Sequence, residues 1–201
     1  MADIKARFEF RTFAQNFGIV ETKMRHFSKC ENIRESSEIY IVSRTNNENN
    51  TKIRDKLMDI KVFVQKQEGL EQWNPRMKGS FPMKAEMIKN DVFPAFQVSM
   101  PEFKRDEYGL EEYLNELIRP HMDLVDVNVF KRRFAFTVNS CITEIAELLI
   151  NGAAIKTVAI ESTDTGAILK AKEMLCLTEY ENVNYLLAIK RIIGMERQDK
   201  L

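Results

Sequence analysis

Charged and apolar residues alternate one by one in several β-forming stretches, and this alternation constrains the fold more than any other feature. In the first such stretch, Ile4 to Phe13, phenylalanines occupy alternate positions and charged residues lie between them: Phe8 and Phe10 against Arg7, Glu9 and Arg11. Because successive side chains of a strand point to opposite sides of the sheet, this segment is predicted to be a strand with one apolar and one charged face.

The same alternation returns in the second half of the chain, in the β-rich stretch Leu124 to Val138. One predicted face carries Val129, Lys131 and Arg133, and the other carries Phe130, Arg132, Phe134 and Phe136. Five further stretches are rich in β-forming residues and are also predicted strands: 38–44, 51–54, 57–65, 140–149 and 154–162. The second and third of these are expected to pair as a hairpin. Residues 142–149 alone are also compatible with a helix.

Apolar residues at helical spacing predict helices over 17–27, 84–90, 106–118, 165–177 and 182–193. Asp164 is expected to cap the fourth helix, and Gly194 is expected to end the fifth. Residues 69–82, which include Trp73 and Pro75, are predicted to be irregular, and residues 93–100 to be extended. Because the strands come in blocks instead of alternating with helices, the sequence favours an α+β fold with an antiparallel sheet.

Composition limits the classes of protein that remain. A chain of 201 residues with 44% hydrophobic and 30% charged residues is expected to form one folded domain, 1–201. Its 30 basic and 30 acidic residues cancel in charge, which argues against nucleic acid as a partner. No apolar run reaches the roughly 18 residues of a membrane helix, so no membrane partner is expected.

The cysteines and the N-terminus indicate the cell compartment. Cys30, Cys141 and Cys176 show no CxxC spacing, which predicts reduced, buried thiols. The first residues lack the apolar segment of a signal peptide. A cytoplasmic location is therefore expected.

The charged positions of the alternating strands form a predominantly basic set. The cations are Arg7, Arg11, Lys52, Arg54, Lys61, Lys131 and Arg133, and the carboxylates are Glu9, Asp59, Glu144 and Glu161. If the apolar faces pack under helices and the sheet curls into a barrel, the charged faces converge on a polar interior. Converging cations are costly unless an anion compensates them, and phosphate suits both the arginine fork and the lysine point charge. The seven cations are therefore predicted to bind phosphate.

The same alternation has a simpler interpretation, because a sheet with one solvated face also shows charge at every second residue. Two observations weigh against it. The strands are more basic than the neutral chain as a whole, and the pattern occurs in both halves of the sequence.

At these residues the sequence resembles the CYTH superfamily of triphosphate tunnel enzymes, which includes class IV-type adenylyl cyclases, thiamine triphosphatases and inorganic triphosphatases. The order and spacing of short segments carry the resemblance. After the N-terminal charged strand come Glu38-Ile39-Tyr40-Ile41-Val42, Thr51-Lys52-Ile53-Arg54, Met58-Asp59-Ile60-Lys61, Lys131-Arg132-Arg133, Cys141-Ile142-Thr143-Glu144-Ile145-Ala146-Glu147 and Val158-Ala159-Ile160-Glu161-Ser162.

The resemblance implies an antiparallel eight-stranded β-barrel, a triphosphate tunnel with flanking helices. By position, it implies phosphate contacts for Lys52, Arg54, Lys61 and Arg133. It also implies metal ligation by Glu9, Glu144 and Glu161, with Mg²⁺ or Mn²⁺ as the cofactor.

Two positions depart from the pattern of the family. Its first strand carries Glu-x-Glu-x-Lys, where this chain has Arg7, Glu9 and Arg11, and its late Glu-x-Glu pair is here Ala159 and Glu161. Fewer carboxylates imply a lower metal affinity. Either arginine replaces part of the metal charge, or catalysis is lost and anion binding is kept. The stretch 65–104 is also longer than the usual connection and is expected to be an insertion within the single domain.

Three functions remain open on the sequence. The first is binding of a triphosphate, nucleotide or polyphosphate with metal-dependent hydrolysis or cyclisation. The second is anion or nucleotide binding without catalysis. The third is an interaction protein whose charged faces are solvated. A homodimer is also compatible with the sequence.

Overall fold

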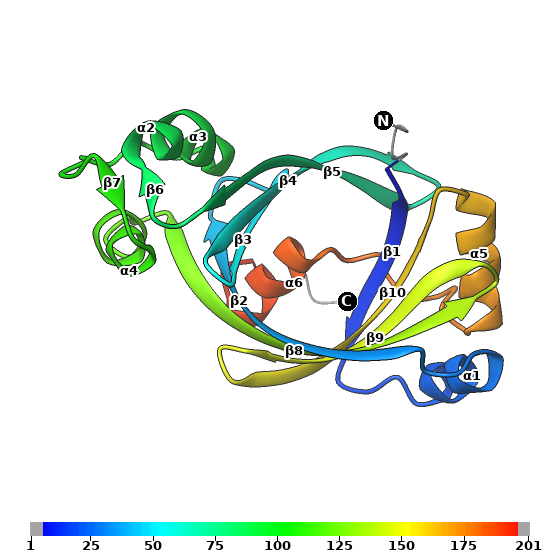
Figure 1. Cartoon of the computed structure of the whole chain (residues 1–201). Helices are drawn as coiled ribbons and strands as arrows, with labels where there is room; N and C mark the ends of the chain where they lie inside the picture. The colour runs from blue at the N-terminus through cyan, green and yellow to red at the C-terminus, as the bar shows by residue number, and fades with distance from the viewer. Residues whose placement is uncertain (1–5, 197–201) are drawn as a thin grey trace. The chain divides into compact units, whose positions relative to one another are not determined.

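The computed structural model describes residues 6–196, and within them eight strands close into an antiparallel barrel (Figure 1). Around the barrel the strands follow the order β1 (Phe8–Ala14), β10 (Ala153–Ser162), β9 (Cys141–Ile150), β8 (Leu124–Val138), β2 (Asn32–Ser43), β3 (Asn49–Arg54), β4 (Leu57–Gln67) and β5 (Leu70–Ser80). This topology confirms the predicted α+β fold class with an eight-stranded barrel. Ile4 and Lys5, part of the first predicted strand, lie outside the described residues.

The chain divides into two compact units, and four of the barrel strands run from one unit into the other. The first unit contains residues 6–36, 63–74 and 130–184, and the second contains residues 37–62, 75–129 and 185–196. Each unit is described by itself below.

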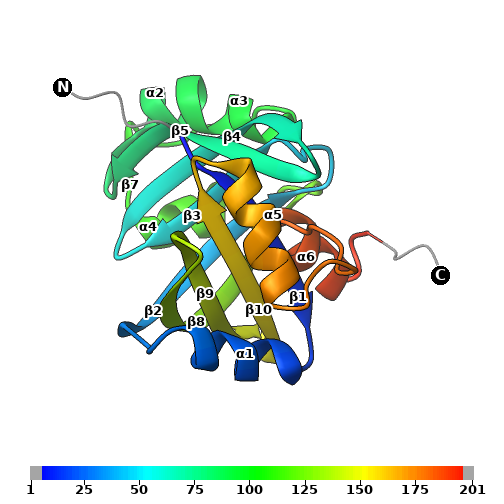
Figure 2. The same cartoon turned by 90° about the vertical axis from the view of Figure 1, so that its right-hand side faces the viewer.

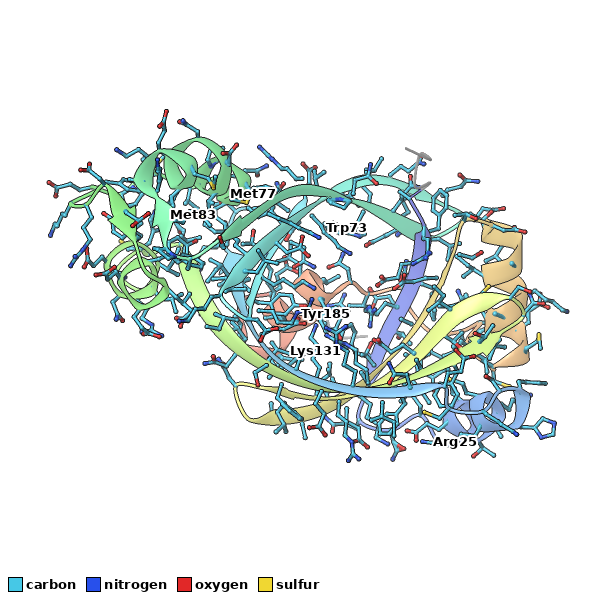
Figure 3. All side chains as sticks on the ribbon, viewed as in Figure 1. Arg25, Trp73, Met77, Met83, Lys131 and Tyr185 are labelled. Carbon is cyan, nitrogen blue, oxygen red and sulfur yellow. The ribbon has the colours of Figure 1, made fainter. Side chains whose placement is uncertain are left out.

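The first unit buries the apolar face of its strands under helices α1 (Ile19–Phe27) and α5 (Thr165–Met174). Phe10 and Ile160 are fully buried with Ile168 of α5, which packs along β10, β1 and β9 (Figure 2). The burial of Phe8 and Phe10 confirms the apolar face predicted for the first strand. On α1, Arg25 lies over the rings of Phe134 and Phe136, at 5.7 Å from each centroid (Figure 3).

The second unit has its own core, built on the apolar residues of β3 and β4. Ile53 and Ile60 pack there with short helical segments and a two-stranded ribbon. These segments are β6 (Met83–Lys84), α2 (Ala85–Met87), the π-helical turn η1 (Ile88–Val92), α3 (Phe93–Phe96), β7 (Glu107–Tyr108), α4 (Leu110–Glu112) and the π-helical turn η2 (Tyr113–Ile118). Met77 and Met83 approach this core over Gly79, where an added Cβ would lie 2.8 Å from the Met83 methyl carbon (Figure 3).

The last helix, α6 (Tyr185–Ile192), also belongs to the second unit. Its Tyr185 ring stacks on Tyr40 at 5.7 Å, and its buried Lys190 donates a hydrogen bond to the carbonyl of Asn46 at 3.0 Å. Gly194 follows with φ of 74°, a left-handed conformation that glycine adopts without strain. None of the helices within residues 6–196 has the length and apolar content needed to cross a lipid bilayer.

Several local predictions are wrong. Residues 69–82 are not irregular, because β5 pairs with β1 in spite of Pro75 and Gly79. Residues 93–100 are not extended, because Phe93 and Phe96 are both buried on one side of α3. The helical alternative for 142–149 is excluded by β9.

Other boundaries and environments also differ from the prediction. The helix predicted over 106–118 begins only at Leu110, after β7, and α6 begins at Tyr185 instead of residue 182. The three cysteines are free thiols as predicted, but only Cys141 is buried. Cys30 and Cys176 are exposed and lie in the segments that follow α1 and α5.

The predicted cap of α5 is confirmed and gives a test of local stability. The side chain of Asp164 accepts a hydrogen bond from the backbone N–H of Ala167 at 3.2 Å. Asp164→Ala leaves that donor without its partner and should lower the free energy of unfolding by about 1 kcal/mol. Urea unfolding measures the change, with Lys170→Ala on the exposed face of α5 as the control. Equal stabilities of the two variants would contradict the capping role.

Candidate functional site

The seven cations predicted to bind phosphate fall into two groups, one in each unit. Those in the first unit are Arg7, Arg11, Lys131 and Arg133, and those in the second are Lys52, Arg54 and Lys61. The two groups differ in how their charge is balanced.

In the first unit, Arg11 is the centre of a cluster of alternating charges. Its Nε donates to Glu9 Oε1 at 2.6 Å, and its Nη1 lies 3.6 Å from Glu144 Oε1. Arg133 approaches the other oxygen of Glu144, with 3.8 Å between Nε and Oε2. We call Glu9, Arg11, Arg133 and Glu144 the arginine–glutamate cluster. Its two guanidinium groups and two carboxylates cancel in charge, and the side chain of Arg11 is only 7% exposed.

Strand register explains how Arg11 reaches Glu144 across an intervening strand. Arg11 on β1 lies opposite Ala159 on β10, and Ala159 lies opposite Glu144 on β9. Residues directly opposite in antiparallel strands project from the same face. The methyl group of Ala159, the smallest side chain that has a Cβ, therefore leaves the space that the guanidinium of Arg11 occupies.

Three carboxylates lie side by side on neighbouring strands, two residues along β1 from Arg11. Glu9 lies opposite Glu161 on β10 and opposite Glu71 on β5. Glu161 is 3.8 Å from Nη1 of Arg7, whose side chain is 53% exposed. Glu71 Oε2 accepts hydrogen bonds from Trp73 Nε1 and Asn184 Nδ2, each at 3.0 Å. The sequence did not point to Glu71 because its strand was predicted to be irregular.

Trp73 and Lys131 complete the polar face of the first unit, and both are labelled in Figure 3. The ring of Trp73 meets Phe63 edge to face at 5.5 Å. This contact and the hydrogen bond to Glu71 indicate that Trp73 is a packing residue. Lys131 is 2% exposed on β8, within the stretch of alternating residues that predicted it.

The residues predicted to bind Mg²⁺ or Mn²⁺ do not fit a divalent cation. Each of Glu9, Glu144 and Glu161 lies within 3.8 Å of an arginine, and a guanidinium repels a metal ion placed beside the same carboxylate. Among residues 6–196, no three carboxylate, histidine or cysteine side chains are grouped so that they could hold a metal ion.

The second unit contains a small basic pocket with a different balance of charge. It is lined by Lys52 and Arg54 of β3, Leu57 and Asp59 of β4, and Lys78 of β5, and we call it the basic pocket. Three cations and one carboxylate thus surround a cavity of about 40 Å³. A single water needs roughly 10–15 Å³ on this scale, so the pocket has room for a group the size of one phosphate.

The pairing of β3 with β4 positions these side chains. Lys52 lies opposite Asp59, with 4.0 Å between Lys52 Nζ and Asp59 Oδ2. Asp59 Oδ1 is buried and accepts no hydrogen bond from the described residues. Arg54 Nη1 lies 3.6 Å from Oε1 of Glu38, whose side chain is fully buried.

Burial lowers the pKa of Lys52 below its ordinary value of 10.5, because the ammonium group loses water. The carboxylates of Glu38 and Asp59 oppose this shift in the pKa, whereas the charges of Lys61 and Arg54 add to it. The protein therefore holds Lys52 where its positive charge is only partly compensated.

The structure thus brings together two of the predicted phosphate ligands, Lys52 and Arg54, with Asp59 of the paired strand β4. Lys61 acts on Lys52 through its charge. Lys78 and Glu38 were not identified from the sequence. Lys78 lies in a segment predicted to be irregular. Glu38 shares a strand face with Tyr40 and Val42, and a carboxylate on that face was a usable signal.

No protein-family model and no curated protein matches the sequence, but solved structures do. A conserved hypothetical protein from Pyrococcus furiosus aligns with a TM-score of 0.53 at 14% identity, over 90% of this chain and 98% of that one. The PH1012 protein from Pyrococcus horikoshii aligns with a TM-score of 0.50 at 14% sequence identity, over 90% of this chain and 97% of that one. A protein from Bacillus halodurans, described as a proposed adenylate cyclase, aligns with a TM-score of 0.51 at 10% sequence identity, over 90% of this chain and 96% of that one.

At these identities the similarity concerns the fold. The shared barrel confirms the fold that the resemblance to the triphosphate tunnel superfamily implied. The resemblance itself is confirmed to that extent, and the roles of individual residues stay predictions.

The ion pair between Arg54 and buried Glu38 gives a test of this description. Arg54→Ala removes the guanidinium beside a buried carboxylate and should lower the free energy of unfolding by about 2 kcal/mol, because Arg54 is itself partly exposed. Adding Glu38→Gln in the same chain should restore part of that loss. Guanidinium chloride unfolding of both variants measures the effect. A double variant less stable than Arg54→Ala would contradict a dominant role of charge pairing.

Proposed function

We propose that the protein binds a triphosphate or a related phosphorylated anion and holds one of its phosphate groups in the basic pocket. The observation that carries this proposal is the basic lining of the pocket. Lys52, Arg54 and Lys78 line it with one carboxylate, Asp59, while Glu38 and Asp55 lie within 4.0 Å of Arg54. A phosphate group supplies the charge that these residues lack.

The chemistry of the lining residues favours phosphate over a carboxylate anion. Arg54 presents a planar fork to two oxygens, and two lysines add point charges around the same small volume. Asp59 Oδ1, which accepts no hydrogen bond from the described residues, is an acceptor for a hydroxyl group or a protonated phosphate oxygen of the ligand. A nucleotide or a polyphosphate offers such a group.

The comparisons support the same class of ligand. The Bacillus halodurans protein with a similar fold is described as a proposed adenylate cyclase, and an adenylate cyclase acts on a nucleoside triphosphate. The resemblance to triphosphate tunnel enzymes points to triphosphates independently. A cytoplasmic location, which the sequence predicts, would give access to such compounds.

The binding part of this function has more support than a catalytic part. The triphosphate tunnel enzymes that this sequence resembles use divalent metals to hydrolyse or cyclise a triphosphate. In this chain the glutamates at the corresponding positions are paired with arginines. We therefore propose anion binding as the primary function. Release of inorganic phosphate or cyclic nucleotide from ATP, thiamine triphosphate or tripolyphosphate tests for catalysis separately.

Tripolyphosphate should stabilise the protein against heat. At a hundredfold excess over Kd, a ligand that binds only the folded state adds about 2.7 kcal/mol to the free energy of unfolding. Lys78→Glu, which places a carboxylate at an exposed position of the pocket, should weaken binding by about tenfold or more. Isothermal titration calorimetry measures the Kd, and Lys29→Ala, an exposed cation outside the pocket, is the control. Binding unchanged in Lys78→Glu, or absent in the unmodified protein, would reject the proposal.

The lowered pKa of Lys52 predicts proton uptake on binding. The unfolded chain keeps the Lys52 proton to higher pH than the folded chain, so without ligand the free energy of unfolding rises as pH increases from the lowered pKa toward 10.5. A bound anion raises the pKa of Lys52, so binding in that window should take up protons and should weaken as Lys52 loses its charge.

Calorimetry in two buffers with different heats of ionisation measures this uptake. Lys52→Arg is the matched variant, because arginine keeps its charge throughout the window and should bind without taking up protons. Equal proton uptake by the two proteins would show that Lys52 is not the titrating group.

A further inference from the structure

We propose that the arginine–glutamate cluster holds the guanidinium of Arg11 as its permanent cation, in place of a divalent metal, and that Ala159 is the substitution that makes room for it. This inference joins Arg11, which stands where the resembling family has a lysine, with the sequence departure at Ala159 in one structural arrangement. It extends the proposed function by predicting anion binding that needs no metal.

The contacts of Arg11 show that its guanidinium is fixed. Its Nε bonds to Glu9 at 2.6 Å, and its Nη1 lies between Glu144 at 3.6 Å and Thr157 Oγ1 at 3.5 Å. Thr157 is itself held, because its hydroxyl donates to the carbonyl of Thr12 at 2.8 Å. The guanidinium therefore has acceptors on β1, β9 and β10.

The backbone of Arg11 is anchored as firmly as its side chain. Its N–H donates to Asn182 Oδ1 at 2.8 Å, and its carbonyl accepts from the N–H of Val183 at 2.7 Å. These bonds add to the pairing of β1 with β10. A rotation of β1 that moved Arg11 away from the glutamates would break them.

Because of their positive charges, the guanidinium of Arg11 and a divalent cation cannot both bind beside Glu9 and Glu144. With Arg11 and Arg133 present, Glu9 and Glu144 are already neutralised, and a metal ion would add two uncompensated positive charges to a largely buried cluster. Arginine does not lose its proton in proteins, so no ordinary pH frees the carboxylates for a metal.

The space beside Arg11 depends on Ala159. Ala159 is 2% exposed and lies in register between Arg11 and Glu144. A glutamate at position 159 would project from the same face, into the space between these two residues. Replacing Arg11 by a neutral residue and Ala159 by glutamate should therefore leave three carboxylates with Arg133 as the one remaining guanidinium of the cluster. This set is better suited to Mn²⁺, a cation that prefers oxygen ligands.

The test compares Mn²⁺ binding by the full-length protein with that of the double variant Arg11→Gln/Ala159→Glu. Isothermal titration calorimetry with MnCl₂, and the thermal shift caused by MnCl₂ relative to EDTA, are the readouts. The double variant should bind Mn²⁺ at least about tenfold more tightly than the unmodified protein. The matched control, Arg34→Gln/Ala153→Glu, makes the same two changes at exposed positions of the first unit and should behave like the unmodified protein.

Saturable binding of one Mn²⁺ by the unmodified protein, as tight as that of the double variant, would overturn the inference. If the double variant does not fold by circular dichroism, the single variant Arg11→Gln decides. It should gain affinity for Mn²⁺, and a loss of affinity would show that Arg11 supports a metal site instead of replacing it.

A second measurement, which rests on the proposed function, uses tripolyphosphate and the unmodified protein. Its Kd in EDTA should be no weaker than its Kd in Mg²⁺, and binding about tenfold tighter in Mg²⁺ would overturn the inference. Absence of binding under both conditions would reject the proposed function instead, and the Mn²⁺ titration would then judge the inference alone.

Discussion

The structure depends on how charged residues on a strand face are neutralised when their own strands form a closed barrel. Apolar residues of the same strands, such as Phe10 and Ile60, are taken up by the two cores, so the charged residues must occupy the opposite face. Charges held close together and away from water are stable only as pairs or with a bound counter-ion. The two units meet this requirement in different ways.

The first unit neutralises its charges internally. Arg11 lies between Glu9 and Glu144, and Arg133 approaches the second oxygen of Glu144. The carboxylate of Glu71 is solvated instead by hydrogen bonds from the neutral side chains of Trp73 and Asn184. The second unit leaves cations in excess around the basic pocket, where burial lowers the pKa of Lys52. The first arrangement is suited to holding a fixed geometry, and the second is suited to receiving an anion.

The exchange proposed at Arg11 and Ala159 would let the fold keep its shape while its chemistry changes. Carboxylates that a metal would join are joined here by a guanidinium, which adds one positive charge where a metal would add two and has a rigid hydrogen-bond geometry. The pairing of β1, β10 and β9 is continuous through these residues.

Strict alternation made much of the fold predictable. The strands around Phe10, Ile53 and Val129 could be recognised because each residue's face follows from its position alone, and the cap at Asp164 because it depends on contacts within one turn. β5 could not, since Pro75 and Gly79 weaken its local preference for strand, and its place in the barrel between β4 and β1 supplies what the sequence lacks. The contribution of Lys78 to the basic pocket was hidden for the same reason.

The sequence by itself determined which residue types alternate on each strand, and hence that a basic face opposes an apolar one. Only the tertiary structure decided which charges meet. Glu9 and Arg11 are neighbours on one strand, but their pairing with Glu144 depends on the register of three strands and on the small side chain of Ala159. Pairing energies fall steeply with distance and depend on burial, so a cation on a strand becomes a binding group or a structural one only when its neighbours across the sheet are fixed.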